Sequence, residues 1–331
     1  MIMIQRTNWL RNQHLIGLFV AVLLCTNMLK AQNEPQYTQY MYNIGSFNPG
    51  YVGTTATPEI IGAYRAQWID LEGAPRNIRF GTNVPFSNEK MGIGFNVVNN
   101  QLGPTTQTFI DLAYSYQFNV SENTKLSFGM DVGGSFLNVD FSKGTFENPG
   151  ERFDAANIKN FYLNIGAGLF LYGGNTWYLG ASIPNFLSDG IYDDDVASVI
   201  EGRMQFNFIG GYVFDLGERL KFKPAFLINS IGGAPLNTNL SGNFLINDKF
   251  TVGAAYRFGN AVSGLAGFQI SNGTFVGYSY DYNTNGLGQF NSGSHEVILK
   301  FYIGKGGSGN NNSNNKKLKG KPKQIDTPRF F

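Results

Sequence analysis

Hydrophobic and polar residues alternate strictly along several stretches of this chain. From position 106 onwards, one face of the stretch is apolar and the opposite face is polar. The apolar face consists of Ile110, Leu112, Tyr114, Tyr116 and Phe118, and the polar face consists of Gln107, Asp111, Ala113, Ser115 and Gln117. Alternation with a period of two predicts a β-strand. The same pattern recurs at 125–133, 161–172, 249–258 and 295–304.

The composition of the two faces indicates where these strands lie. The polar faces carry mostly Gly, Ser, Asn and Gln, whereas the exposed face of a water-soluble sandwich would usually carry Lys, Glu and Thr. Aromatic residues such as Trp68, Phe86, Trp177 and Phe301 fall near predicted strand ends, where membrane barrels have their aromatic girdles. The pattern therefore favours an all-β outer-membrane barrel over a soluble sandwich.

Segmenting the chain gives about fourteen antiparallel strands, an even number that is typical of bacterial outer-membrane barrels. The predicted strands are 58–68, 76–84, 90–98, 105–119, 125–141, 160–172, 176–183, 203–215, 219–228, 236–246, 249–258, 261–270, 274–281 and 295–303. The barrel domain is accordingly predicted to span 58–303.

The connections between these strands alternate in length. Those after even-numbered strands are short, whereas those after odd-numbered strands are variable and include three long ones at 142–159, 184–202 and 282–294. Short periplasmic turns opposite longer extracellular loops are typical of outer-membrane barrels. This assignment predicts that both termini lie in the periplasm.

The facing of the charged residues agrees with a membrane barrel. Arg65, Asp111, Arg257 and Lys300 all fall on the predicted lumen side of their strands. A Lys or Arg that faced lipid at the membrane midplane would cost about 2 to 4 kcal/mol.

The N-terminal residues resemble a cleavable export signal. Arg6 and Arg11 precede the apolar run LIGLFVAVLLC, and Ala31 closes NMLKA in the position of a small-residue cleavage site. We expect a signal peptide at 1–31, cleaved after Ala31. The one cysteine, Cys25, lies within the apolar run, with Leu24 before it, and a lipoprotein anchor there is the less favoured alternative. A mature chain without cysteine has no disulfides and no thiolate chemistry.

Net charge and reactive residues exclude several classes of function. The formal net charge of +2, without a basic face on the body of the chain, argues against a nucleic-acid partner. His295 is the one histidine outside the predicted leader, and the neighbouring Ser292 and Ser294 are not expected to form a catalytic pair with it. The run 193–195 of three aspartates is read as a solvated loop in preference to a calcium site. The sequence predicts no enzyme, no cofactor and no metal.

Composition shifts abruptly after the last predicted strand. Residues 304–331 form a Gly/Asn-rich linker, a cluster of lysines and an aromatic end, and we expect a flexible periplasmic tail. Two interpretations stay open. The tail is either a solvated extension or a docking peptide for a periplasmic partner, with Arg329, Phe330 and Phe331 as its anchor.

Five motifs resemble a known family. The entry PQYTQYMYN is followed by NPGYVGT, then by YRAQWIDLEGAPRN, and the chain closes with SHEVILKFYIG and PRFF. Together they resemble the PorP/SprF family of type IX secretion system outer-membrane proteins of the Bacteroidetes. The most specific part of the resemblance is Arg65, Gln67 and Trp68 followed by Gly73, Ala74 and Pro75. Gly50 departs from the Ala that such proteins often have there, which leaves the resemblance intact.

The resemblance implies a barrel that works with the type IX machinery, which exports proteins across the outer membrane and in many gliding bacteria delivers surface adhesins. Its partners would be the C-terminal domain of a secreted surface protein, periplasmic secretion subunits, or both. The alternative function is a passive diffusion channel for small solutes, which the Gly-, Ser- and Asn-rich lumen face favours.

The segment 32–57 ahead of the first strand is aromatic and irregular. It holds too many aromatic residues to stay in water and too much Gly and Pro to form a strand. About fourteen strands enclose a lumen that their own side chains do not fill. We therefore expect the segment to pack into the lumen or across its periplasmic mouth as a partial plug, with a simple linker as the alternative. The side chains expected to fill the lumen are Tyr37, Tyr40, Tyr42, Phe47 and Tyr51.

Overall fold

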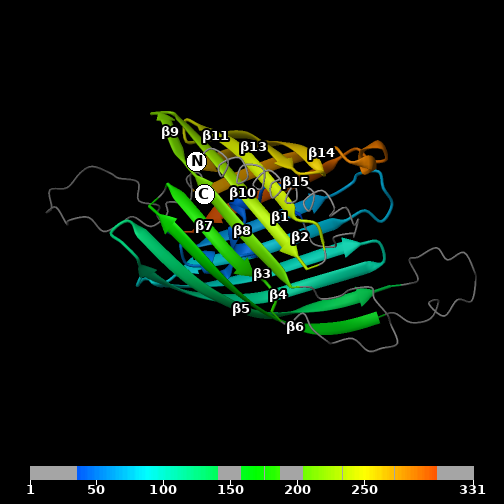
Figure 1. Ribbon diagram of the computed structural model, residues 1–331, viewed down its shortest axis with the longest axis horizontal. Helices are drawn as coiled ribbons and strands as arrows, with labels where there is room; N and C mark the ends of the chain where they lie inside the picture. Colours follow the sequence, from blue (N-terminus) through cyan, green and yellow to red (C-terminus); the bar gives the residue numbers. More distant parts are fainter. Residues whose placement is uncertain are drawn as a thin grey trace, which may run out of the picture.

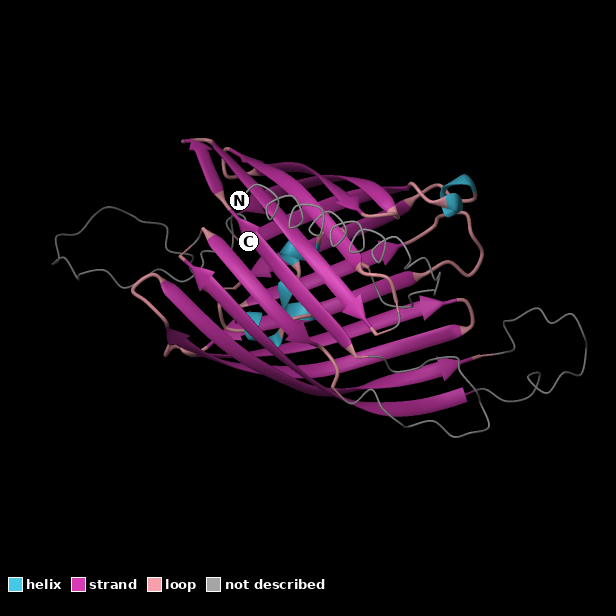
Figure 2. Cartoon of the chain, viewed as in Figure 1, coloured by secondary structure: helices cyan, strands magenta, loops and turns pink. Residues whose placement is uncertain are grey.

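The computed structural model describes residues 36–140, 158–174, 176–186, 204–232, 234–271 and 273–303. These residues form an antiparallel β-barrel with short 3-10 helices inside it (Figures 1 and 2). The strands are β1 (Glu59–Ala66), β2 (Arg76–Pro85), β3 (Met91–Leu102), β4 (Thr105–Asn119), β5 (Thr124–Val139), β6 (Ile158–Gly173), β7 (Trp177–Ile183), β8 (Gln205–Tyr212), β9 (Phe214–Gly217), β10 (Leu220–Ile231), β11 (Asn237–Ile246), β12 (Phe250–Arg257), β13 (Ala261–Ser271), β14 (Thr274–Asn283) and β15 (Ser294–Tyr302).

The barrel is closed and its wall has fourteen strand positions. Each strand pairs with the next along the chain, except that β8 pairs with β10 and not with β9, and β15 pairs with β1 to close the barrel. β8 and β9 both pair with β10 and form one wall position that is interrupted at Val213. Val213 leaves the ladder there and its amide donates to the Thr176 carbonyl at 2.7 Å. The predicted count of about fourteen antiparallel strands is confirmed.

Strand boundaries differ from the prediction at a few ends. β4 begins and ends where the alternation predicts, whereas β3 continues to Leu102, four residues beyond the predicted end at 98. The first three residues of the extension are polar, but its pairing with β4 persists, and Asn99 Nδ2 donates to Thr108 Oγ1 at 2.8 Å. A side-chain hydrogen bond across the ladder thus takes over where apolar alternation stops.

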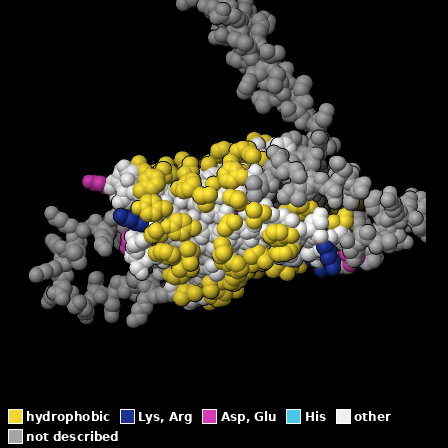
Figure 3. All heavy atoms as spheres, turned by 90° about the horizontal axis from the view of Figure 1, so that it is seen from below, with side chains coloured by type: hydrophobic (Ala, Val, Ile, Leu, Met, Phe, Trp, Pro, Cys, Tyr) yellow, Lys and Arg dark blue, Asp and Glu magenta, His cyan; other side chains and the backbone are white. Residues whose placement is uncertain are grey.

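The two faces of the wall have opposite character. Apolar side chains such as Leu112 and Phe250, each 60% exposed, point outward. On the side of the barrel seen in Figure 3, hydrophobic side chains spread over the wall and charged ones lie toward its two ends. Polar residues such as Ser115 and Ser127 point inward and are fully buried. An outward apolar band is what a lipid bilayer requires of a barrel wall.

The charged wall residues face the lumen, as predicted. Arg65, Arg257 and Lys300 are buried inside the barrel, and Asp111 is half-buried on the inward face of β4. Lys300 Nζ lies 3.1 Å from Glu59 Oε2, and both side chains are buried. Among the described residues, no helix is both long and apolar enough to cross a membrane.

We name the two ends of the barrel by their connections. The turn end carries the connections 86–90, 120–123, 174–176, 218–219, 247–249 and 272–273, and β1 begins there. The loop end carries 67–75, 103–104, 140–157, 184–204, 232–236, 258–260 and 284–293, including the 3-10 helix η6 (Gly286–Gln289). Most of the two longest loops lies outside the described residues. The periplasmic position of the turn end stays a prediction.

Candidate functional site: the lumen segment and its two attachments

The residues that precede β1 lie inside the barrel. We call residues 36–57 the lumen segment; it contains η1 (Tyr40–Tyr42), η2 (Ile44–Ser46) and η3 (Pro49–Tyr51), drawn in cyan within the wall in Figure 2. Tyr40, Met41 and Thr54 are fully buried. The segment's aromatic residues belong to one apolar cluster with inward wall residues such as Phe170 and Phe275. The apolar core of this protein is therefore built around the lumen segment.

The lumen segment crosses the barrel from the loop end to the turn end. Tyr37 Oη donates to Asn77 Oδ1 at 2.8 Å, and Asn77 is the second residue of β2, at the loop end. The Gly53 amide donates to Asn83 Oδ1 at 2.6 Å, six residues further along β2 and toward the turn end. Six strand residues correspond to about 20 Å. The segment then turns back into β1.

Four charged side chains meet at the loop end of the lumen. We call Arg65, Arg257, Asp281 and Glu296 the charge cluster. Arg65 Nη2 lies 2.6 Å from Asp281 Oδ2, and Arg65 Nη1 lies 2.9 Å from Glu296 Oε2. Arg257 Nη1 is 3.7 Å from the same Asp281 oxygen, and its Nε donates to Asn239 Oδ1 at 2.8 Å. Two cations and two anions balance one another in a buried site.

Thr38 of the lumen segment sits in the middle of the charge cluster. Its Oγ1 donates to Asp281 Oδ1 at 2.7 Å and accepts from Arg65 Nη1 at 3.1 Å and from Arg257 Nη2 at 3.2 Å. The amides of Thr38 and Gln39 donate to the two carboxylate oxygens of Glu296 at 2.8 and 3.0 Å. Hydrogen bonds to ionised groups are the stronger kind, so the cluster fixes the backbone of the segment as well as one side chain.

The turn-end half of the segment is attached by close backbone packing. Five inward-facing glycines on β3, β5, β6 and β7 form a surface that we call the glycine floor: Gly92, Gly94, Gly129, Gly168 and Gly180. A Cβ built on Gly92 would lie 2.2 Å from Gly53 Cα, and one built on Gly129 would lie 2.2 Å from the Pro49 carbonyl oxygen. At Gly92 and Gly129 backbone meets backbone, whereas the other three glycines lie against the side chains of Asn48 and Val52. No larger residue fits at these positions without a shift.

Hydrogen bonds lock the segment onto the glycine floor. Asn48 Nδ2 donates to the Leu169 carbonyl at 3.0 Å, while Asn48 Oδ1 accepts from the Gly50 amide at 2.9 Å and caps η3. Ser115 donates to the Val52 carbonyl and Gln117 to the Gly53 carbonyl. The NPGYVG sequence is thus held by its backbone, which explains why it needs Pro and Gly and has no apolar periodicity.

The aromatic side chains of the segment fill the space between these two attachments. Tyr40 Oη lies 2.9 Å from Ser241 Oγ, the Tyr42 ring is 5.0 Å from the Phe275 ring, and the Tyr51 ring meets Phe170 edge-on at 5.4 Å. Lys223 Nζ lies 5.8 Å from the centre of the Tyr42 ring. A buried ammonium group over an aromatic face is attracted by the ring quadrupole.

The residues predicted for the site fall in two places. Tyr37, Tyr40, Tyr42 and Tyr51 are buried in the lumen, and Phe47 is half-buried, with its carbonyl accepting a hydrogen bond from Ser182. Trp68, Gly73 and Pro75 belong to the loop between β1 and β2, at the loop end. Arg329, Phe330 and Phe331 lie outside the described residues. Arg65 is the one predicted residue that touches the lumen segment from the wall.

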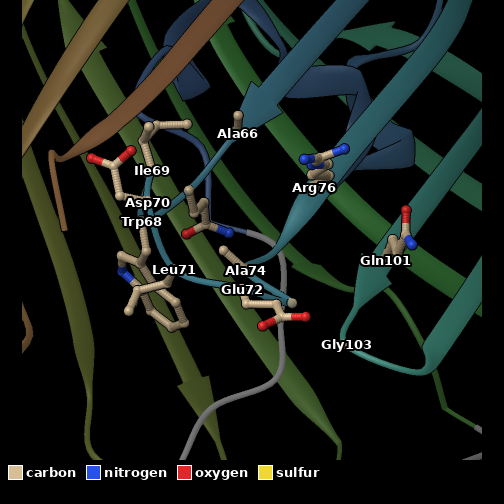
Figure 4. A pocket seen from close by; sticks show the side chains of 12 residues that line it. Ala66, Trp68, Ile69, Asp70, Leu71, Glu72, Ala74, Arg76, Gln101 and Gly103 are labelled. Carbon is tan, nitrogen blue, oxygen red and sulfur yellow. The ribbon is translucent and has the colours of Figure 1, made fainter. Parts of the chain in front are cut away.

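The β1–β2 loop is held in a fixed shape at the loop end. The Ile69 amide donates to the Gly293 carbonyl at 2.9 Å, and the Gly103 amide donates to the Gly73 carbonyl at 2.8 Å. Trp68 and Asp70 have positive φ values of 48° and 76°, which are uncommon for residues with a side chain. The loop lines a cavity of about 380 Å³, shown in Figure 4 with Trp68 and Leu71 on one side and Arg76 and Gln101 on the other.

Sequence reasoning missed several residues of the two attachments. Thr38, Asp281 and Glu296 are not among the predicted site residues. Both carboxylates nevertheless occupy lumen-facing positions on β14 and β15, along which buried and exposed residues alternate. These two positions could have been identified from the sequence, because a charged residue that faces the lumen needs a buried partner. The glycines of the floor gave a weaker signal, because glycine at an inward position also fits an open pore.

The candidate catalytic residues have other partners. His295 lies on the outer side of β15, where its Nδ1 is 2.6 Å from Tyr278 Oη. Ser292 Oγ donates to Asp70, and Ser294 Oγ accepts from the Trp68 amide. The run 193–195 is outside the described residues. Within the described ranges, no three His, Cys, Asp or Glu side chains gather as a metal site would require.

Several solved structures resemble the chain at low sequence identity. Among solved structures, it resembles a FadL homologue from Pseudomonas aeruginosa (12% identity, TM-score 0.42, covering 81% of this chain and 93% of that chain). It also resembles the CymD monoaromatic hydrocarbon channel (9% identity, TM-score 0.47, 81% and 93%) and an outer membrane channel from Pseudomonas putida F1 (11% identity, TM-score 0.39, 75% and 96%). No curated protein matches the sequence.

The family comparison covers the lumen segment and the barrel. Residues 29–301 match the family described as type IX secretion system membrane protein PorP/SprF. This family consists of secretion-system membrane proteins and is not a family of enzymes. The fold and the match together make the protein an outer-membrane barrel of the type IX secretion system. The chain belongs to the PorP/SprF family.

Proposed function

We propose that this barrel holds a protein partner of type IX secretion and does not act as an open pore. The partner is a secreted surface protein, such as a gliding adhesin recognised through its C-terminal domain, or a periplasmic subunit of the machinery. The observation that carries the proposal is the complete burial of Tyr40, Met41 and Thr54, because a lumen that conducts solutes would leave side chains in its centre exposed to water.

Further observations support a closed lumen. The lumen segment is bonded to strands on all sides of the wall, from Asn77 on β2 to Glu296 on β15. A lumen cavity beside Gly45 and Asp111 has a volume of about 40 Å³, which is room for a few water molecules only. The lumen segment therefore acts as a plug.

The proposal includes an orientation. The turn end faces the periplasm, the signal peptide is removed after Ala31, and the basic tail at 304–331 extends from the turn end into the periplasm. Short connections on one side and long ones on the other support this orientation. A secreted surface protein would then be held at the loop end, and a periplasmic subunit at the turn end.

The direct test is purification of the tagged protein from its native outer membrane in mild detergent, followed by mass spectrometry of the proteins that accompany it. We expect a large secreted surface protein or periplasmic secretion subunits. A matched variant with Arg329, Phe330 and Phe331 replaced by alanine locates the contact: it loses a periplasmic partner and keeps one bound at the loop end. A barrel that purifies alone would contradict the proposal.

The second candidate function is a diffusion channel, favoured by the polar residues on the inner face of β11. Asn237, Asn239, Ser241 and Asn243 all face the lumen there. Planar-bilayer conductance separates the two functions. We expect the intact protein to be closed and a variant that lacks residues 36–55 to conduct. Equal conductance of both would reject the plug and favour the channel.

A further inference from the structure

The cavity under the β1–β2 loop is bordered by the outward-facing side of the wall. Ala66, Arg76 and Gln101 line it, and they are register partners at outward positions of β1, β2 and β3. The next outward residues on β1 and β2 are Tyr64 and Ile78, which are exposed and belong to the apolar band. Aromatic residues at the edge of such a band lie at the level of the lipid head groups. The cavity therefore lies beside the head-group layer at the loop end.

The loop over the cavity has a fixed shape of its own. The Gln67 amide donates to the Pro75 carbonyl at 2.9 Å and closes the loop at its base. The Ser292 amide donates to the Ile69 carbonyl at 3.0 Å, which adds a second bond to the β14–β15 loop. Gly73 has a φ of 72°, and its carbonyl accepts a hydrogen bond from the β3–β4 turn. A pre-formed site loses little conformational entropy when it binds a ligand.

Four polar side chains of the lining have no partner in the described part of the chain. They are the side-chain amides of Gln67 and Gln101, the carboxylate of Glu72 and the guanidinium of Arg76. None of them forms a hydrogen bond or an ion pair with another described residue. Amides donate and accept, a carboxylate accepts and a guanidinium donates. The cavity thus offers both donors and acceptors to a ligand.

The remaining side chains of the lining give the cavity an apolar surface. They include Trp68, Ile69, Leu71 and Ala74, and Figure 4 shows Trp68 across the cavity from Gln101. A sugar ring has the same division, because its C–H groups form an apolar face that packs on an indole ring and its hydroxyls each donate and accept. Sites for small ligands likewise combine an apolar lining with a few polar groups that fix the orientation of the ligand.

We propose that this cavity binds the sugar head group of a membrane glycolipid. Its volume of about 380 Å³ lies in the range of about 300 to 1,000 Å³ that is typical of small-ligand sites, so it has room for a short saccharide and not for a folded domain. A phosphate head group would be attracted by Arg76 and repelled by Glu72 and Asp70, whereas uncharged hydroxyls can bond to all three side chains. The position beside the head-group layer favours a ligand that is anchored in the membrane.

Isothermal titration calorimetry of the purified full-length protein in detergent, stripped of bound lipid, tests the proposal. Three probes are compared: lipopolysaccharide of the native outer membrane, the oligosaccharide released from it by mild acid, and phosphatidylethanolamine, which carries no sugar. Because the protein is purified, the result depends neither on the orientation of the barrel nor on the proposed function.

Three variants locate the binding. Trp68→Ala removes the aromatic surface. Gln101→Ala removes one amide from β3, outside the loop, and leaves the bonds of the loop in place. Gln289→Ala, exposed at the loop end and outside the cavity, is the matched control. Heat-modifiability confirms that each variant is folded.

We expect lipopolysaccharide and its released oligosaccharide to bind to the wild type and to Gln289→Ala, and phosphatidylethanolamine to bind to neither. The dissociation constant should rise about tenfold in Trp68→Ala and about threefold in Gln101→Ala, which loses one neutral hydrogen bond. No binding of either sugar probe, equal binding of phosphatidylethanolamine, or binding that neither substitution changes would overturn the proposal. Released oligosaccharide that binds while the intact lipid does not would overturn the membrane source of the ligand.

Discussion

The two attachments of the lumen segment are built in contrasting ways. At the loop end, Thr38 and Gln39 are held by four buried charges on β1, β12, β14 and β15. At the turn end, residues 48–53 lie closely packed on glycines of β3, β5, β6 and β7, and no ion pair among the described residues joins them to the wall. One attachment depends on charge and the other on shape.

The contrast indicates a division of roles. Close packing on glycine tolerates no displacement, because a shift of a fraction of an ångström already loses contact. Buried ion pairs repay their desolvation only in good geometry, so they specify an arrangement more than they stabilise it. We therefore expect the glycine floor to fix the position of the segment and the charge cluster to be the attachment that a partner can release.

The largest effect should come from Arg65→Leu. The change leaves Asp281 and Glu296 buried with one fewer cation, and breaking a buried ion pair costs about 3 to 5 kcal/mol. Equilibrium unfolding in detergent measures the loss of stability. Maleimide labelling of a Gln36→Cys variant, made in a Cys25→Ser background, reports whether the start of the lumen segment has left the charge cluster. Arg76→Leu, an exposed arginine at the same end, is the matched control. Equal effects of the two changes would show that the cluster does not hold the segment.

Thr38→Val should have the next largest effect. It keeps the shape of the side chain and removes a hydroxyl that bonds to Asp281 and to both arginines, and hydrogen bonds to charged groups contribute about 1.5 to 3 kcal/mol. Faster labelling of Gln36→Cys is the readout. Thr106→Val, on the wall and away from the segment, should be neutral. An unchanged labelling rate in Thr38→Val would argue that the charge cluster does not hold the loop end of the lumen segment.

Gly92→Val tests the attachment by shape. The new side chain would collide with Gly53, and overpacking typically costs about 1 to 3 kcal/mol. Limited proteolysis should then cleave within residues 48–53 while the loop end stays protected. Gly264→Val is the control, because a Cβ at that exposed glycine meets nothing within 4 Å. Release of both ends together would mean that the two attachments are one cooperative unit.

Tyr40→Phe should give the smallest effect. The change removes one neutral hydrogen bond, to Ser241, and leaves the ring in place, so the expected loss is about 1 kcal/mol. The thermal unfolding midpoint measures it, with the exposed Tyr282→Phe as reference. A loss as large as that of Thr38→Val would show that the middle of the segment contributes as much as its ends.

The barrel wall was predictable because each strand is specified by the apolar and polar pattern of its own residues. Alternation sets the facing of β4 and β12 residue by residue, since one face meets lipid and the other meets the lumen. The boundaries of β4 are clear because Gly103 and Pro104 precede it. The interruption at Val213, between β8 and β9, has no such signal in the sequence. An apolar residue at this position is equally compatible with one uninterrupted strand.

The site was predictable only in part. Aromatic residues without periodicity predicted that the segment before β1 packs in the lumen, and the structure places Tyr40 and Tyr42 there. The partners of Thr38 and the direction of the segment could not be predicted, because they depend on strands that lie more than 200 residues away in sequence. Contacts at such separation follow from closure of the whole barrel.

The bond between Thr38 and Glu296 also sets an order of assembly. These residues are 258 positions apart, and Glu296 takes its place only when β15 pairs with β1 to close the wall. Contacts at such long sequence separation form late, since the entropy of closing the loop must first be overcome. Thr38 and Gln39, which leave the ribosome before any strand, are therefore among the last residues to reach their final partners. Residues 48–53 contact β3 to β7, so their attachment does not have to wait for β15 to close the wall.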